Sequence, residues 1–470
     1  MPAISAPNFI FINTDQQRFD TLGCYGSPVA KTPHLDKLAE EGVRFTQCYT
    51  TNPVCMPARA SYFTGQYPSH HGVWQNGVPL NPHAELIHHR LRDAGYHAAL
   101  IGKIHLDNVW LRTEKHPSYG FDPLLECEGD PYCKDDYFHW LDSEGLYDGY
   151  MAQFKREGHK RGYTREIDEA HHMNNWITGH VERYLDQRNR DSQPFFLSVG
   201  FFDPHHPFDP CEPYASLFNP AAMPMPSYRA GEEETMTPLA RAHHDRMQAF
   251  CRNPAEIGTT MAAYHATIAH VDAMVGRIMA ALEATSLAEN TVVIFTSDHG
   301  ELLGDHGLLH KGPYFFDPSI HVPLIYRFPR HCALHGVDAG FTSHIDLAPT
   351  LAALAGIDEP KLVQGMPLFS RDGALRPTPA RDFALVEWRE KAFNSDDPFQ
   401  VARCLVTDRW KYVFYQDRDY GELYDRENDP AEQYNRWSDP AFQPIVREMR
   451  ERLWNSLLQS EPHPRRTDIF

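Results

Sequence analysis

Short apolar runs separated by helical patterns recur along the first three quarters of the chain. Runs rich in valine, isoleucine and phenylalanine predict buried strands. The predicted strands are Asn8–Asn13, His97–Gly102, Pro194–Phe202, Thr291–Thr296 and His321–Arg327. Because helical patterns lie between these runs, we expect an α/β fold with a large, mostly parallel sheet that helices cover on both faces.

Apolar residues at helical spacing mark the connecting segments. They predict helices at Thr32–Gly42, Ala84–Ala94, Glu166–Gln187, Thr259–Ala284 and Thr350–Ala355. In the first helix Thr32 can act as the N-cap, and Pro33 suits the first turn. Residues 107–165 and 208–255 show no regular pattern. We expect these two segments to be long irregular excursions that shape a substrate pocket.

The pattern changes near residue 375. Three strand patterns and a last helix follow, at Phe383–Glu387, Ala402–Thr407, Trp410–Tyr415 and Ile445–Leu458. This order is typical of a small antiparallel sheet with a helix. We therefore predict a catalytic α/β domain at residues 1–374 and an α+β subdomain at residues 375–470.

The composition and charge of the chain limit the kinds of molecule that it can bind and the kinds of site that it can contain. The 470-residue chain has 42% hydrophobic residues, as in globular proteins, and its net charge of −19 argues against nucleic acid or an anionic membrane as partner. Nine irregularly spaced cysteines predict neither a disulfide framework nor a Cys-x-x-Cys zinc site. The N-terminus lacks the features of a signal peptide, so we expect a cytoplasmic protein. A homo-oligomer is compatible with the sequence.

Polar residues directly follow four of the predicted strands. They are Asp15 with Gln16, Lys103 with His105, Asp203 with His205, and Asp298 with His299. The carboxyl ends of parallel strands form the ligand-binding edge of a sheet, so we expect these residues to converge.

Two of these pairs suggest a metal site. Asp15 and Asp298 would repel each other unless a cation lay between them. Gln16 and His299 can complete a mixed oxygen and nitrogen site for one divalent ion, Ca²⁺ or Mn²⁺, and the histidine favours Mn²⁺. The alternative interpretation is that the two carboxylates only cap helices.

A second group of side chains suits a tetrahedral anion. Lys103 and Lys311 are point charges, while His105 and His205 can transfer protons near neutral pH.

The segment from Cys55 to Gly65 adds a cysteine. Pro57 suits the first turn of a helix that Gly65 can end, so Cys55 would lie just before a helix N-terminus, where N–H groups favour anions. Arg59 adds a cation one turn away. The alternative is a buried structural cysteine before an ordinary helix.

Taken together, these motifs resemble those of the formylglycine-dependent sulfatases of the alkaline phosphatase superfamily. Cys55-x-Pro57-x-Arg59, extended to Thr64-Gly65, is similar to the site at which such enzymes have cysteine oxidised to formylglycine. The other similar motifs are Gly102-Lys103-x-His105, Pro204-His205-x-Pro207, Thr296–Gly300, Lys311-Gly312, Thr407–Lys411 and Glu422–Asp425. The resemblance implies an alkaline phosphatase-like sheet with a smaller C-terminal antiparallel sheet and helix.

The resemblance also implies roles for individual residues. Cys55, converted to formylglycine (3-oxoalanine) by a formylglycine-generating enzyme, would be the nucleophile and would also bind the metal. The other implied metal ligands are Asp15, Gln16, Asp298 and His299. Around the sulfate, the resemblance implies that Arg59 and Lys103 steady the sulfate group and that Asn76 contacts it. His105 would accept a proton. His205 and Lys311 would bind the sulfate and assist the departure of the leaving oxygen.

One pair departs from the sulfatase pattern. Many sulfatases have an acidic residue where Gln16 stands and an asparagine where His299 stands, whereas this pair resembles the phosphonate monoester and phosphodiester hydrolases of the superfamily. Our first interpretation is hydrolysis of a small-molecule or saccharide sulfate ester, and the alternative is phosphonate monoester or phosphodiester hydrolysis with the same nucleophile. A non-catalytic protein that binds sulfated ligands and a cysteine hydrolase are further hypotheses.

Overall fold

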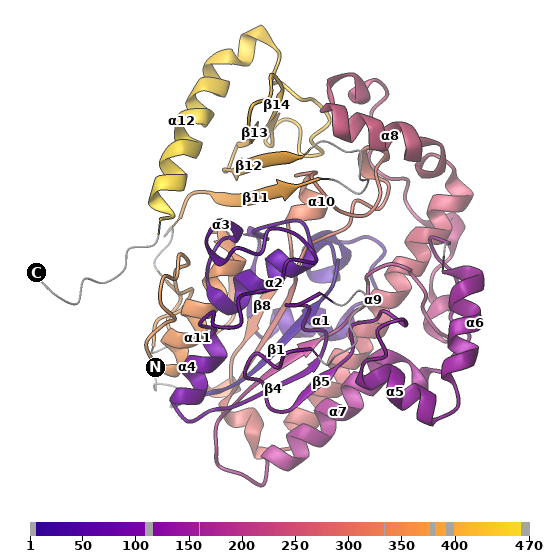
Figure 1. The fold of residues 1–470 in the computed structure, drawn as a ribbon, viewed down its shortest axis with the longest axis vertical. Coiled ribbons are helices and arrows are strands. Elements are labelled where there is room, and N and C mark those ends of the chain that lie inside the picture. The colour runs from indigo at the N-terminus through magenta and orange to yellow at the C-terminus, as the bar shows by residue number, and fades with distance from the viewer. Residues whose placement is uncertain are drawn as a thin grey trace, which may run out of the picture.

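The computed structural model describes residues 6–108, 116–158, 160–332, 334–371, 373–376, 381–391 and 399–461. Within these residues an eight-stranded sheet forms the centre of the molecule (Figure 1). Its order is β5 (Leu124–Glu126), β4 (His97–Gly102), β6 (Phe195–Gly200), β1 (Asn8–Thr14), β7 (Thr291–Ser297), β8 (Leu324–Arg327), β2 (Val43–Phe45) and β9 (Gly336–Asp338). The first five strands are parallel, and β8 runs antiparallel to both neighbours. The predicted mostly parallel sheet is therefore confirmed.

Helices cover both faces of this sheet, which explains why its central strands are apolar along their whole length. Alternate residues of β1 point to opposite sides, with Ile10 and Ile12 in one core and Phe9 and Phe11 in the other. The first core is closed by α1 (Pro33–Glu40), α7 (Met173–Arg188) and α9 (Pro254–Glu283), and the second by α2 (Cys55–Thr64), α4 (Ile87–Asp93) and α11 (Leu347–Ala355).

The prediction of irregular excursions was wrong for large parts of both segments. The first contains β5, α5 (Asp136–Ser143) and α6 (Tyr147–Glu157), and the second contains α8 (Pro238–Cys251). Aromatic side chains of α5 such as Tyr137 and Phe138 enter the first core. Tyrosine and tryptophan mixed with aspartate and glycine hide the helical periodicity that this burial follows. Residues 109–115 lie outside the described residues.

Several helix starts also differ from the predictions: α9 begins at Pro254 and not at Thr259, and α11 begins at Leu347 and not at Thr350. The helix expected from Ala84 begins at Ile87, and the one expected from Glu166 begins at Met173. Thr32 precedes α1 as predicted, but its hydroxyl accepts from Gly23 N–H and makes no capping bond to α1. The helix N-terminus is held instead by the buried Asp272 of α9, whose carboxylate accepts from the N–H groups of His34 and Leu35.

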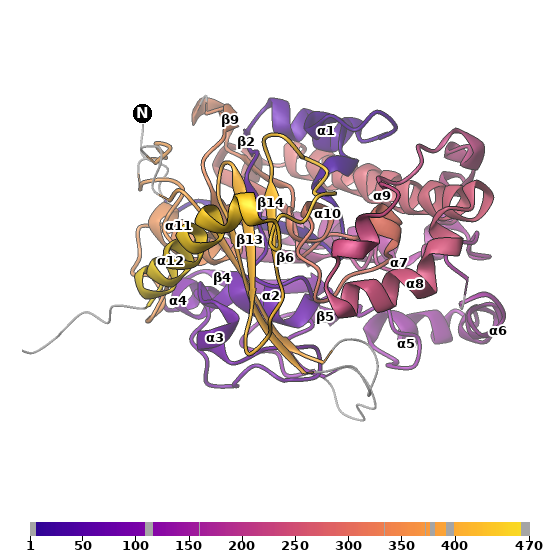
Figure 2. The same cartoon turned by 90° about the horizontal axis from the view of Figure 1, so that it is seen from above.

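A second, antiparallel sheet lies at the C-terminal end of the described chain. It consists of β11 (Ala384–Glu390), β12 (Gln400–Val406), β13 (Trp410–Tyr415) and β14 (Gly421–Asp425), and α12 (Gln443–Gln459) packs on it (Figure 2). Sequence patterns predicted the first three strands and the helix, whereas β14 was not predicted as a strand. The domain boundary at residue 375 stays a prediction.

Lys411 of β13 connects this sheet to the helix α10 (Asp317–Ile320). Its buried ammonium lies 2.6 Å from Asp317 Oδ1 and also contacts Glu432. Asp317 begins α10 (Asp317–Ile320), six residues after Lys311. The short elements that remain are β3 (Cys48–Tyr49), which pairs with β10 (Thr342–Ser343), and α3 (Pro68–His71). None of the helices in the described parts of the chain has the length and apolar character needed to cross a bilayer.

Candidate active site

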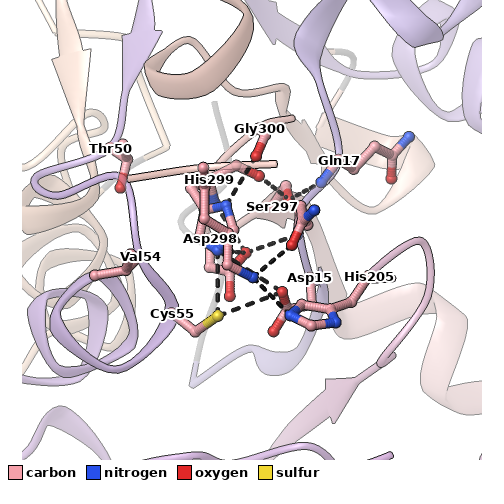
Figure 3. Close-up of polar contacts among 12 residues, drawn as sticks. Asp15, Gln17, Thr50, Val54, Cys55, His205, Ser297, Asp298, His299 and Gly300 are labelled. Atoms are coloured by element: carbon pink, nitrogen blue, oxygen red, sulfur yellow. Dashed lines mark hydrogen bonds and ion pairs between the residues drawn. The ribbon is translucent and has the colours of Figure 1, made fainter. Parts of the chain in front are cut away.

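Neighbouring strands and one helix bring four predicted residues together. β1 and β7 pair in register up to Thr14 and Ser297, so Asp15 and Asp298 leave the sheet side by side. Cys55 begins α2, and its Sγ lies 3.5 Å from Asp15 Oδ1 and 3.2 Å from His299 Nε2 (Figure 3). The ligand atoms of Asp15, Cys55, Asp298 and His299, which we call the Cys55 cluster, lie within 4.8 Å of one another, and all four residues are buried. The predicted convergence is therefore present.

Both carboxylates turn one oxygen away from the centre and one toward it. Arg59 donates to Asp298 Oδ2 at 2.9 Å and to Asp15 Oδ2 at 3.2 Å, and Lys103 Nζ lies 2.8 Å from Asp15 Oδ2. The Oδ1 atoms of Asp15 and Asp298 each lie 3.7 Å from His299 Nε2. Burial by itself would raise the pKa of Asp15, but Lys103, His205 and Arg59 hold it well below its ordinary value. Asp15 is therefore ionised.

The ring of His299 is oriented as a metal ligand requires. Its Nδ1 lies 2.9 Å from the carbonyl oxygen of Gly300, so Nδ1 carries a proton and Nε2 presents its lone pair to the centre. Two inward carboxylate oxygens and this nitrogen form a donor set that fits a divalent cation.

Gln16 and Lys311 lie beside the Cys55 cluster. Lys311 Nζ donates to Gln16 Oε1 at 2.5 Å and lies 2.6 Å from His205 Nε2. His205 Nδ1 lies 2.6 Å from the carbonyl of His206 and donates to it, so Nε2 is the acceptor that faces Lys311. The sequence placed Gln16 with the metal ligands and His205 and Lys311 in the separate group for a tetrahedral anion, and it did not foresee that Lys311 joins the two groups.

The remaining predicted residues reach the site in different ways. Lys103 and His105 follow β4, and the buried His105 Nδ1 has no hydrogen-bond partner in the described parts of the chain. Asn76 Oδ1 accepts from Met56 N–H at 3.0 Å, in the first turn of α2. Asp203, also expected at this edge, does not join the centre: it accepts from Asn174 Nδ2 at 2.7 Å, and burial raises its pKa to about 8.

Four residues that support the site were missed from the sequence. Asn13 Oδ1 accepts a hydrogen bond from Arg59, and Glu301 accepts one from Gln16. Glu128 Oε1 accepts from the N–H groups of Ile104 and His105. The ring of Phe202 lies 4.8 Å from Lys103 Nζ. Asn13 and Phe202 are the last residues of predicted strands, so the argument from strand ends that identified Asp15 could also have identified them. Nothing in their spacing identified Glu128 or Glu301.

Comparison with protein families supports this view of the site. A family model described as Sulfatase matches residues 7–357. The chain belongs to the sulfatase family. As a sulfatase it is a sulfuric ester hydrolase, which confirms the predicted enzyme class. A second model, for the C-terminal region of N-sulphoglucosamine sulphohydrolase, matches residues 304–459 of this sulfatase and includes the antiparallel sheet.

Individual relatives cover most of the chain. An uncharacterized sulfatase of Escherichia coli (strain K12), YidJ, is 34% identical over 467 residues, which are 95% of this chain and 86% of that protein. An N-acetylglucosamine-6-O-sulfatase of Bacteroides thetaiotaomicron is 25% identical over 540 residues, covering 99% of this sulfatase and 89% of the relative.

A solved structure extends the comparison beyond the sulfatases. The phosphonate monoester hydrolase of Agrobacterium radiobacter superposes with a TM-score of 0.83 at 26% identity, over 98% of this chain and all of the other. The alkaline phosphatase-like fold that the sequence implied is thereby confirmed.

Proposed function

We propose that this sulfatase hydrolyses sulfate esters with a nucleophile formed from Cys55. The convergence of Cys55 with two carboxylates and an imidazole at the carboxyl ends of β1 and β7 carries the proposal. Residue 55 would be formylglycine, made from the cysteine by a formylglycine-generating enzyme during maturation. The substrate class is a small-molecule or saccharide sulfate ester, and inorganic sulfate is released.

Four residues would hold one divalent cation, Ca²⁺ or Mn²⁺, beside residue 55. They are Asp15, Gln16, Asp298 and His299, which offer carboxylate and amide oxygens and one imidazole nitrogen. When bound, the ion supplies positive charge that lowers the pKa of a hydroxyl on residue 55 and offsets the charge of the sulfate. Arg59 donates to the outward oxygens of both carboxylates. It therefore holds Asp15 and Asp298 in place and leaves their inward oxygens for the ion.

Proton transfer and sulfate binding fall to side chains around this centre. Burial and the neighbouring Lys103 hold the pKa of His105 well below its ordinary value, so the ring is neutral and can accept the proton that residue 55 gives up. The Lys311 ammonium contacts Gln16 and His205. Its remaining N–H would donate to a sulfate oxygen. His205 is held by the His206 carbonyl and would assist the leaving oxygen.

Mass spectrometry of the peptide that contains Cys55 tests the nucleophile. We expect a species lighter than the cysteine peptide that reacts with a hydrazide reagent for aldehydes. An unmodified thiol in protein that turns over sulfate esters would overturn the role of formylglycine and favour a different nucleophile.

The alternative substrate class rests on Gln16, a neutral residue where many sulfatases carry an acid. A less negative ligand set leaves more positive charge for the substrate, which suits phosphonate monoesters or phosphodiesters. Relative kcat/KM on an aryl sulfate and an aryl phosphonate separates the two: we expect the sulfate to be preferred, and a strong preference for the phosphonate would overturn our first choice.

A further inference from the structure

Glu301 is a buried carboxylate that the proposed mechanism does not use. It follows the His299-Gly300 pair and is 0% exposed. Its Oε1 accepts from the N–H groups of Leu303, at 2.9 Å, and His310, at 2.5 Å, while Oε2 accepts from Gln16 Nε2. Its carboxylate thus joins the segment before Lys311 to the end of β1.

These contacts decide which way the Gln16 amide faces. A carboxylate only accepts hydrogen bonds, so the NH₂ group of Gln16 must face Glu301. The oxygen then faces Lys311, which only donates. The reversed amide would set oxygen against carboxylate and NH₂ against ammonium, so both contacts would become repulsive. Gln16 Oε1 keeps a second lone pair beside the one that accepts the hydrogen bond from Lys311.

Gln16 is also bound to the metal-ligand group through its backbone. Its N–H donates to Asp298 Oδ1 at 2.9 Å, and its φ of 68° lies in the left-handed region, which a glutamine adopts only when its surroundings hold it there. An amide held by its backbone but free at its side chain could still rotate. The contact of Nε2 with Glu301, together with that of Oε1 with Lys311, removes that freedom.

We propose that Glu301 is a positioning residue, which fixes the amide oxygen of Gln16 as a ligand and sets Lys311 against it. This inference rests on the proposed function, because it assumes a divalent cation bound by Gln16. Partners that hold metal ligands typically contribute about 10–100-fold to metal affinity. Glu301 acts through Gln16 and touches neither the sulfate nor residue 55.

The test is a Mn²⁺ titration of chelator-stripped protein. We expect Glu301→Gln to raise the Kd for Mn²⁺ by about 10–100-fold, because a neutral amide partner can also donate, so it no longer excludes the reversed Gln16 amide and leaves the orientation to Lys311 alone. Saturating Mn²⁺ should restore most of kcat. The matched control is Glu422→Gln. Glu422 is a buried glutamate of β14 in the other sheet, and its carboxylate accepts a hydrogen bond from Tyr415. The Mn²⁺ Kd of this control variant should differ from that of the wild type by less than about twofold.

A double-mutant cycle separates positioning from a general effect on the fold. In a Gln16→Ala background, Glu301→Gln should change the Mn²⁺ Kd by less than about threefold, since the contact is already absent. An equal loss in both backgrounds would overturn the inference. If Glu301→Gln does not fold, Glu301→Asp, which keeps the charge but shortens the reach, takes its place in the cycle and should also weaken Mn²⁺ binding.

Two results distinguish this inference from the function on which it rests. A wild-type protein that binds Mn²⁺, together with a Glu301→Gln variant of equal affinity, overturns the inference alone. A wild-type protein that binds no divalent cation overturns the metal-assisted function and, with it, the role of Glu301.

Discussion

Two buried groups of cysteine and histidine in this sulfatase look alike by distance and differ in chemistry. One is the Cys55 cluster. The other, which we call the Cys211 cluster, consists of His172, Cys211 and His270, and its ligand atoms also lie within 4.8 Å of one another. It is packed between α7 and α9, where the His270 ring stacks 4.1 Å from Tyr214.

The two clusters differ in where their lone pairs point. In the Cys55 cluster the proton on His299 Nδ1 is fixed by a carbonyl, so Nε2 faces the other ligand atoms and lies 3.2 Å from Cys55 Sγ. In the Cys211 cluster His172 Nδ1 accepts from Asn174 N–H at 3.2 Å, as the N-cap of α7, so its proton resides on Nε2. A metal there would have to displace either that cap or that proton. Closeness of ligand residues alone therefore does not make a metal site.

The clusters also differ in charge. Two carboxylates give the Cys55 cluster the negative charge that a cation site needs, and Arg59 and Lys103 hold them in place. The Cys211 cluster contains no carboxylate, and burial raises the pKa of Cys211 to about 12, so its sulfur stays a thiol. We therefore expect chemistry only at Cys55.

The largest expected effect is on activity. Cys55→Ala should lower kcat on an aryl sulfate by about 10⁴-fold or more, because it removes the group from which the nucleophile is made. The matched change Cys211→Ala should leave kcat within about threefold, since the second thiol only packs. Steady-state kinetics of both variants tests the comparison, and a comparable loss at Cys211 would contradict it.

Metal removal gives the next largest effect. A chelator should lower kcat by about 10³-fold, in line with the several kcal/mol that a Lewis-acid cation supplies, and Mn²⁺ or Ca²⁺ should restore it. Elemental analysis should find about one ion per chain, lost in Asp298→Ala and kept in His270→Ala. Loss of the ion in His270→Ala alone would reverse the assignment of the two clusters.

The sequence predicted the first cluster because strand ends carry information about position. Asp15, Lys103, His205 and Asp298 each follow an apolar run, and parallel strands bring such ends to one edge. Asp203 follows the same rule and still turns away, toward Asn174 of α7. The position of a residue at the carboxyl edge of the sheet can thus be predicted from the sequence. The direction in which its side chain points depends on its hydrogen-bond partners in other segments, which the sequence pattern does not show.

The remaining features depend on contacts between distant segments, which no local pattern encodes. Glu301 and Gln16 meet only after β1 and β7 pair, and Glu128 reaches the N–H of His105 across a loop. The helices α5 and α6 were missed because aromatic residues in mixed polar surroundings obscure the period that burial follows, and α8 was missed because its buried positions include His243 and His244. Likewise, Lys411 was noted for its motif, but its ion pair with Asp317 joins the antiparallel sheet to α10.

The smallest expected effect concerns protons at the Cys211 cluster. Burial, with Arg165 nearby, lowers the pKa of His172 to about 3, against about 6.5 in the unfolded chain. Between these values the unfolded chain binds a proton that the folded chain does not, so stability falls as pH falls, by about 1.4 kcal/mol per pH unit from this residue. His172→Asn keeps an N-cap for α7 but removes the titrating ring, so its free energy of unfolding should fall less steeply below pH 6.5 by about that amount. Urea unfolding between pH 5 and 8, with the exposed His83→Asn as control, measures the slopes. Parallel curves for wild type and His172→Asn would contradict the lowered pKa of His172.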